Sequence, residues 1–128
     1  MTIAARLSIT PGTRLWFSRV EWLRVLGPLP DGVTMTGDFA AATVAVVFVS
    51  NADSVRWFVD RYRTVMTRPA ALWVCYPTRG RSDFNRPMLQ TMVAAHGLHP
   101  DQDVALDGSW TALRLRRLVP GRPPVAPR

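Results

Sequence analysis

Two arginines in the segment Thr78-Arg79-Gly80-Arg81-Ser82 are the side chains of this sequence best suited to bind a ligand. The segment follows an apolar run at residues 72–76 and precedes a stretch of helical spacing, and α/β sheets usually bind ligands where a strand ends and a helix begins. Two guanidinium groups, a hydroxyl and the free amides of a helix start suit a phosphate or a carboxylate. Asn51 and Ser18 follow neighbouring predicted strands, so we expect them near this loop. We therefore predict a small-anion site at Thr78, Arg79, Gly80, Arg81, Ser82 and Asn51, the alternative being a solvated basic loop.

The other reactive side chains do not form a catalytic or metal-binding set. His96 and His99 lie on either side of Gly97, where a helix should end, so we do not expect them to share a face and predict no metal site. Cys75 stands in the middle of an apolar run, which indicates a buried thiol rather than a nucleophile. We predict no catalytic residue and no cofactor. The sequence leaves open whether the protein is an enzyme, with the balance towards no.

Five tryptophans are many for a chain of 128 residues. Most should lie in the core, but Trp57 is outside the inward stripe of its predicted helix and Trp110 falls in a predicted turn. Exposed tryptophan is typical of protein interfaces. We therefore predict that Trp57 and Trp110 contribute to an interface with a protein partner or with a second copy of the chain.

The positive charge is concentrated at one end of the chain. The net charge is +7 and every basic residue is arginine, but residues 1–113 hold eleven arginines against nine acids. The remaining charge comes from Arg114, Arg116, Arg117, Arg122 and Arg128. A basic end can bind polyanions through counterion release. No recognition motif accompanies the charge, so nucleic-acid binding is the least favoured interpretation and a solvated tail is its alternative.

Strand and helix patterns alternate along the chain. Strands are predicted at residues 14–17, 33–36, 43–49, 72–76, 103–107 and 112–118. Ser18 and Glu21 have the spacing of a capping box, which predicts a helix that buries Val20, Leu23 and Leu26. Ser50 or Asn51 should cap a second helix, and Asn85 should cap a third.

This order predicts an α/β fold: a small Rossmann-like three-layer domain with a mostly parallel sheet of about six short strands, a C-terminal antiparallel hairpin and three helices. Residues 1–118 should form one domain and residues 119–128 a flexible tail. The second and third helices should cover one face, which leaves the other face thinly covered near the hairpin. A turn at residues 108–111 would place Asp103 opposite Arg116, with Asp103, Asp107, Arg114 and Arg116 on one face and Leu106 on the other.

Three segments resemble domain-of-unknown-function family 3052, a family of small bacterial proteins: Leu26-Gly-Pro-Leu-Pro-Asp-Gly-Val33, Ala71-Leu-Trp-Val-Cys-Tyr-Pro77 and Ser109-Trp-Thr-Ala-Leu-Arg114. The resemblance spans residues 7–118 and implies a shape similar to a trimmed methyltransferase-like Rossmann domain, with no activity attached. A nucleotide-binding first turn needs glycines. Here residues 17–22 contain none, so we expect neither a methyl donor nor a dinucleotide bound in the usual way.

Three functions remain open from the sequence. The first is a non-catalytic Rossmann-like binding or interaction domain. The second is a binder of a small anionic ligand, or a degenerate methyltransferase-like domain. The third is weak nucleic-acid association through the Arg-rich end. One cysteine, an apolar run too short for a membrane span and an N-terminus unlike a secretory signal lead us to expect a cytoplasmic location.

Overall fold

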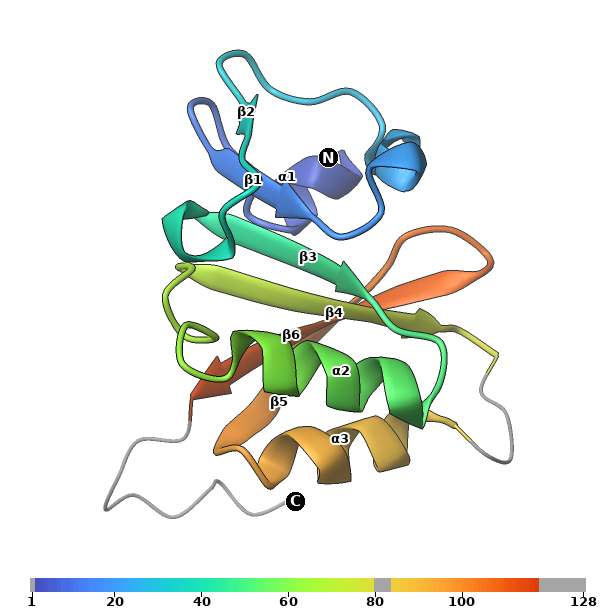
Figure 1. The fold of residues 1–128 in the computed structure, drawn as a ribbon. Coiled ribbons are helices and arrows are strands. Elements are labelled where there is room, and N and C mark those ends of the chain that lie inside the picture. Colours follow the sequence, from blue (N-terminus) through green and yellow to red (C-terminus); the bar gives the residue numbers. More distant parts are fainter. Residues whose placement is uncertain (1, 80–83, 118–128) are drawn as a thin grey trace.

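The computed structural model describes residues 2–79 and 84–117. Six strands form one sheet in the order β2-β1-β3-β4-β6-β5 (Figure 1). Their bounds are Arg14–Phe17 for β1, Thr34–Met35 for β2, Val44–Phe48 for β3, Ala71–Pro77 for β4, Leu98–Ala105 for β5 and Trp110–Arg117 for β6. The first four are parallel, and β6 runs antiparallel to both β4 and β5. The predicted Rossmann-like fold class with its terminal hairpin is therefore confirmed.

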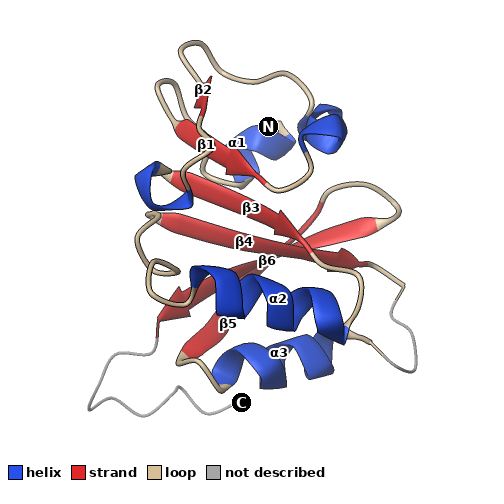
Figure 2. Ribbon diagram, in the orientation of Figure 1, coloured by secondary structure: helices blue, strands red, loops and turns tan. Residues whose placement is uncertain are grey.

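The helices cover the two faces of the sheet unequally (Figure 2). Helices α2 (Ala52–Tyr62) and α3 (Arg86–Ala94) pack on one face. The short helix α1 (Ile3–Arg6) and the 3₁₀ helix η1 (Val20–Leu26) pack on the other. A second 3₁₀ turn, η2 (Phe39–Ala41), precedes β3. None of the helices in the described ranges is long and apolar enough to span a bilayer.

Central strands β3 and β4 are buried on both faces because their residues are almost all apolar, which suits parallel strands covered from both sides. On the η1 face, the indole of Trp73 is fully buried and its Nε1 donates to the carbonyl oxygen of Leu7 at 2.9 Å. This bond ties the N-terminal segment to the middle of the sheet. Val104 and Ala112 of the hairpin are also buried on this face, so the predicted thin cover near the hairpin is wrong.

Two of the three predicted helix caps are confirmed. Asn51 accepts a hydrogen bond from the Ser54 amide at 2.8 Å, and Asn85 accepts one from the Met88 amide at 3.2 Å. The capping box predicted at Ser18 is wrong: η1 begins after Arg19, without a side-chain cap, and Val20 is 60% exposed. Ser18 instead bonds to a neighbouring strand, a partner that local spacing does not reveal.

The predicted register of the hairpin is also wrong. Asp103 lies opposite Leu113, three residues from the expected Arg116. The reason is Asp107, whose carboxylate accepts the amides of Ser109 and Trp110 and so belongs to the turn. A shift by an odd number of residues turns every side chain to the other face. Arg114 and Arg116 therefore share a face with Val104 and Leu106, not with Asp103.

Candidate functional site at the carboxyl edge of the sheet

The carboxyl ends of β1, β3 and β4 lie at one edge of the sheet (Figure 1). After β1 the chain enters η1 on one face, and after β3 it enters α2 on the opposite face. The gap between β1 and β3 is therefore the topological switch point, where open α/β sheets usually bind their ligands.

Ser18 spans this switch point. Its amide donates to the carbonyl oxygen of Val46, and its hydroxyl oxygen accepts from the amide of Phe48, both at 2.9 Å. The two strands therefore remain joined one residue beyond the end of β1. With a bonded serine here and no glycine in the turn that follows, the residues do not fit a nucleotide or methyl-donor cofactor in the usual position.

Three aromatic rings fill the η1 side of the switch point. The centroids of Trp22 and Phe48 are 5.1 Å apart, those of Phe48 and Trp110 5.0 Å, and those of Trp22 and Trp110 5.3 Å. The guanidinium of Arg19 lies 4.2 Å from the Trp22 ring and pairs with Glu21. The pKa of Glu21 is lowered mainly by a backbone hydrogen bond and, to a smaller extent, by a hydrogen bond from the Arg19 side chain.

Trp110 is the first residue of β6, so its expected place in a turn is wrong. Its indole is half-buried against Trp22 and Phe48. Its role in an interface stays a prediction.

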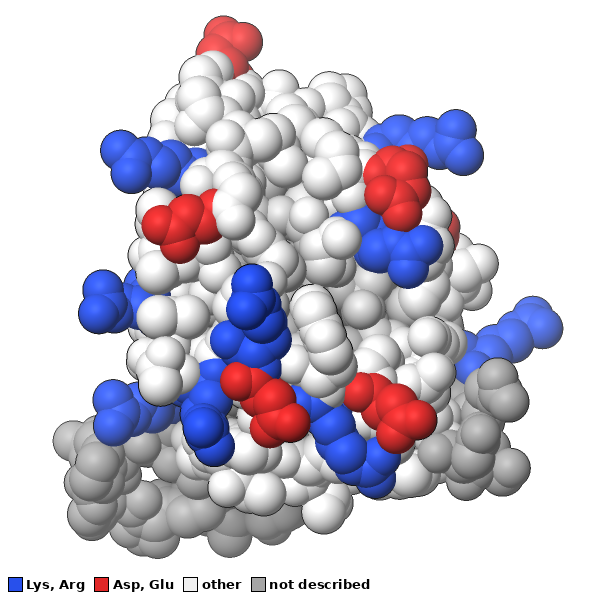
Figure 3. Space-filling model, in the orientation of Figure 1, with Lys and Arg blue, Asp and Glu red and all other residues white. Residues whose placement is uncertain are grey.

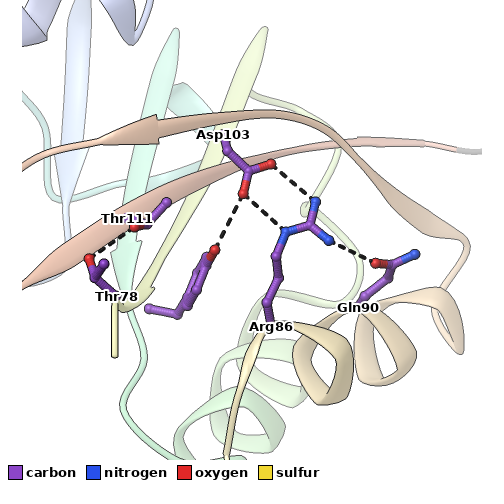
Figure 4. A network of polar contacts seen from close by, with 6 residues as sticks. Thr78, Arg86, Gln90, Asp103 and Thr111 are labelled. Atoms are coloured by element: carbon purple, nitrogen blue, oxygen red, sulfur yellow. Dashed lines mark hydrogen bonds and ion pairs between the residues drawn. The ribbon is translucent and has the colours of Figure 1, made fainter. Parts of the chain in front are cut away.

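The predicted anion loop is described only in part. Gly80, Arg81 and Ser82 lie outside the described residues. The amide of Thr78 donates to the carbonyl oxygen of Ser109 at 2.8 Å, and its hydroxyl bonds to that of Thr111 at 2.9 Å (Figure 4). Thr78 thus fastens the end of β4 to the hairpin.

Arg79 is exposed and lines a hollow of about 460 Å³ together with Pro77, Gly108 and Ser109. Asn51 uses its side-chain oxygen to cap α2, and within the described ranges no hydrogen bond joins it to Ser18 or Arg79. Of the predicted anion ligands in the described ranges, Arg79 is the one with a positive charge, and its guanidinium makes no hydrogen bond to another described residue.

A polar network at the same edge was missed by sequence reasoning (Figure 4). The guanidinium of Arg86 donates to both carboxylate oxygens of Asp103 at 3.0 and 3.1 Å and to Gln90 at 3.1 Å. The Tyr76 hydroxyl donates to the same carboxylate at 3.3 Å. Burial, and then the charge of Asp103, raise the pKa of Tyr76. The network joins α3 to β4 and β5, and no local sequence signal could have revealed it because the pairing depends on the hairpin register.

Cys75 is fully buried, and burial raises the pKa of its thiol far above the ordinary value. It is therefore a neutral core side chain, as expected. His96 is exposed and His99 half-buried, and within residues 2–79 and 84–117 no three His, Cys, Asp or Glu side chains gather as metal ligands would.

At the β1 end of the α2 face, η2 packs beside α2. Helix α2 and η2 meet there over a group of rings that we name the aromatic flank: Trp16, Phe39, Trp57 and Tyr62. Phe39 and Tyr62 stack with centroids 4.6 Å apart, whereas Trp57 is 63% exposed. Figure 3 shows few charged side chains on this part of the surface, above α2 in the view. The predicted exposure of Trp57 is confirmed, whereas Phe39 is buried and Trp16 and Tyr62 are half-buried beneath it.

Comparison with solved structures shows the fold. A Streptococcus pneumoniae protein assigned as a tRNA (m1A22) methyltransferase matches with a TM-score of 0.54 and 9% identity, over 86% of this chain and 66% of its own. The DhpI–SAH complex matches with a TM-score of 0.54 and 12% identity, over 91% of this chain and 82% of its own. Ribosomal protein L11 methylase of Lactobacillus delbrueckii subsp. bulgaricus matches with a TM-score of 0.50 and 10% identity, over 90% and 74% of the two chains.

These likenesses show a Rossmann-like fold. The chain spans just under two thirds of the Streptococcus pneumoniae protein. No family model matches the chain, and no curated protein matches it by sequence. The resemblance to family 3052 stays a prediction.

Proposed function

We propose that this chain is a non-catalytic Rossmann-like binding domain and that its partner is a second copy of itself. The observation that carries the proposal is Trp57, a large apolar side chain that is 63% exposed and is the exposed member of the aromatic flank. Exposed tryptophan is costly in water and is enriched at the centres of interfaces. The closure of the switch point by Ser18 supports binding through the surface rather than through a cofactor site.

The charges of α2 favour a second copy as the partner. Trp57 is at the middle of the helix, with Asp53 four residues before it and Arg61 four residues after it, so the three share one face. In a symmetric dimer the same surface meets itself. If two α2 helices pack antiparallel about Trp57, Asp53 of each copy lies opposite Arg61 of the other. The dimer then contains two such pairs, and each joins opposite charges.

Sedimentation velocity over a range up to about 100 μM tests the proposal. We expect the wild type to show a dimer that grows with concentration and Trp57→Ala to remain monomeric. Val20→Ala is the matched control, because Val20 is 60% exposed on η1. A wild type that stays monomeric throughout, or a Trp57→Ala variant that associates like the wild type, would overturn the proposal.

The second candidate is a small-anion site beside Arg79, in a degenerate methyltransferase-like domain. Arg79 favours it, because this exposed guanidinium lines a hollow at the edge where the fold usually binds ligands. Sulfate or phosphate should then raise the melting temperature by binding to the native state alone. Arg79→Ala combined with Arg81→Ala should abolish that rise. An equal rise in the double variant would show that the loop binds no anion.

A further inference from the structure

Two adjoining hollows lie at the opposite edge of the sheet, where α2 ends, β4 begins and β6 ends. Their volumes are about 340 and 430 Å³. They share Met66, Thr67, Leu98 and Arg117 as lining residues. Each is the size of a small-ligand pocket. We call them together the amino-edge hollow.

The lining of the amino-edge hollow is basic and contains no acid. Its cationic or titratable members are Arg63, Arg114, Arg116, Arg117, His96 and His99. Figure 3 shows basic side chains gathered around the end of α2, at the lower left of the view. A concave surface lined by charges of one sign focuses the field on a ligand of the opposite sign.

The arginines of the hollow differ in whether they already form an ion pair within the protein. Arg116 pairs with Asp101, and this hydrogen bond lowers the pKa of that carboxyl. Among the described residues, Arg63 and Arg117 form neither an ion pair nor a hydrogen bond through their side chains. Their guanidinium groups remain able to donate to a phosphate.

The rest of the lining is apolar. Leu72, Leu98 and Leu115 are buried and line the hollow together with Met66 and Pro69. Apolar side chains can pack against the flat face of a base, whereas inorganic phosphate has no apolar part to pack against them. Guanidinium groups beside an apolar lining therefore match a ligand with a ring at one end and a phosphate at the other.

We propose that the amino-edge hollow binds a nucleoside phosphate, with Arg63 and Arg117 on the phosphate and the apolar residues against the base. The ligand is either a free nucleotide or a nucleotide within a single strand. The site is distinct from the switch point and from the aromatic flank, so it does not depend on self-association.

The test measures fluorescence anisotropy of a labelled oligoadenylate with the full chain, together with competition by AMP and the effect of AMP on the melting temperature. Arg63→Ala with Arg117→Ala should weaken binding about tenfold or more, as expected for two lost phosphate contacts. Two controls remove the same charge elsewhere: Arg6→Ala with Arg24→Ala on the η1 face, and Arg122→Ala with Arg128→Ala near the C-terminus. Both controls should change the affinity by less than about threefold.

AMP that competes and raises the melting temperature identifies a free nucleotide, whereas binding of the oligoadenylate alone identifies a strand. The proposal is overturned if neither probe binds. It is also overturned if either control weakens binding as much as the test variant, since net charge would then explain the affinity.

Discussion

Ser18 joins β1 to β3 through both its backbone and its side chain, although it lies outside every strand. Replacing it with alanine would leave the Phe48 amide without its acceptor. We expect Ser18→Ala to lower the free energy of unfolding by about 1–2 kcal/mol in urea denaturation. Ser109→Ala is the control, because among the described residues the hydroxyl of Ser109 makes no hydrogen bond. Equal stability of the two variants would show that the Ser18 bond does not hold the strands together.

The buried thiol of Cys75 should make stability depend on pH. Burial raises its pKa in the folded state, so below the ordinary thiol value of about 8.5 both states carry the proton and the thiol has no effect. Above that value only the unfolded chain releases the proton, and unfolding is favoured by up to about 1.4 kcal/mol per pH unit. This part of the stability is therefore lost as the pH rises.

Urea denaturation between about pH 8.5 and 10 measures this slope. Subtracting the profile of Cys75→Ala removes the contributions of other groups, including Tyr76, whose pKa is also raised. Parallel profiles for the two proteins would contradict the assignment of Cys75 as a buried neutral thiol.

The hydrogen-bond partner of a side chain could be predicted where that partner lies nearby in the sequence, and not where it is distant. Asn51 and Asn85 cap the helices that begin immediately after them, so spacing alone identified them. Ser18 has the same local pattern but bonds to Phe48, 30 positions away in the sequence. A hydroxyl that has both a local and a distant partner available cannot be assigned from spacing.

At the scale of elements, the Arg86–Asp103 pair is the main polar link between α3 and β5. Both side chains are more than one third exposed, so solvent screening limits the strength of the pair. A double-mutant cycle with Arg86→Ala and Asp103→Ala should give a coupling energy of about 0.5–1 kcal/mol, since the geometry is bidentate.

The matched pair for this cycle is Arg19–Glu21, which has one short contact and is more exposed. Its coupling energy should be smaller, and added salt should weaken both. A coupling at Arg86–Asp103 no greater than that at Arg19–Glu21 would show that the network does not fasten α3.

The hairpin shows where element prediction failed. The alternation of apolar and polar residues predicted both strands. Their register depends on where the turn begins, and the turn begins earlier than predicted because the Asp107 carboxylate accepts two amides within it. A β-bulge between Pro100 and Gln102 shifts the register again. Because of these two local features, the ion pair between Arg86 and Asp103 could not be predicted from the sequence.

At the scale of the whole molecule, the fold was the most predictable property. Apolar runs separated by helical stripes allow few arrangements of a parallel sheet, and right-handed crossovers assign the helices to faces. The functional surface was less predictable. The exposure of Trp57 followed from its place outside the helical stripe, but the aromatic flank needs Trp16 and Phe39, which come from other elements. The amino-edge hollow likewise joins residues from α2, β4 and β6 that no motif connects.

Charge reversal in α2 tests the proposed dimer most directly. In the proposed dimer, Asp53→Arg would place an arginine opposite Arg61 of the second copy, and symmetry repeats this pair. Arg61→Asp would likewise place an aspartate opposite Asp53 of the second copy. Each single variant should weaken self-association by at least about tenfold in sedimentation, since opposed like charges repel across an interface. Circular dichroism should show that the helix remains folded. Combining the two changes restores opposite charges, and we predict that the double variant dimerises nearly as well as the wild type. A double variant as weak as the single ones, or single variants that dimerise normally, would contradict the account.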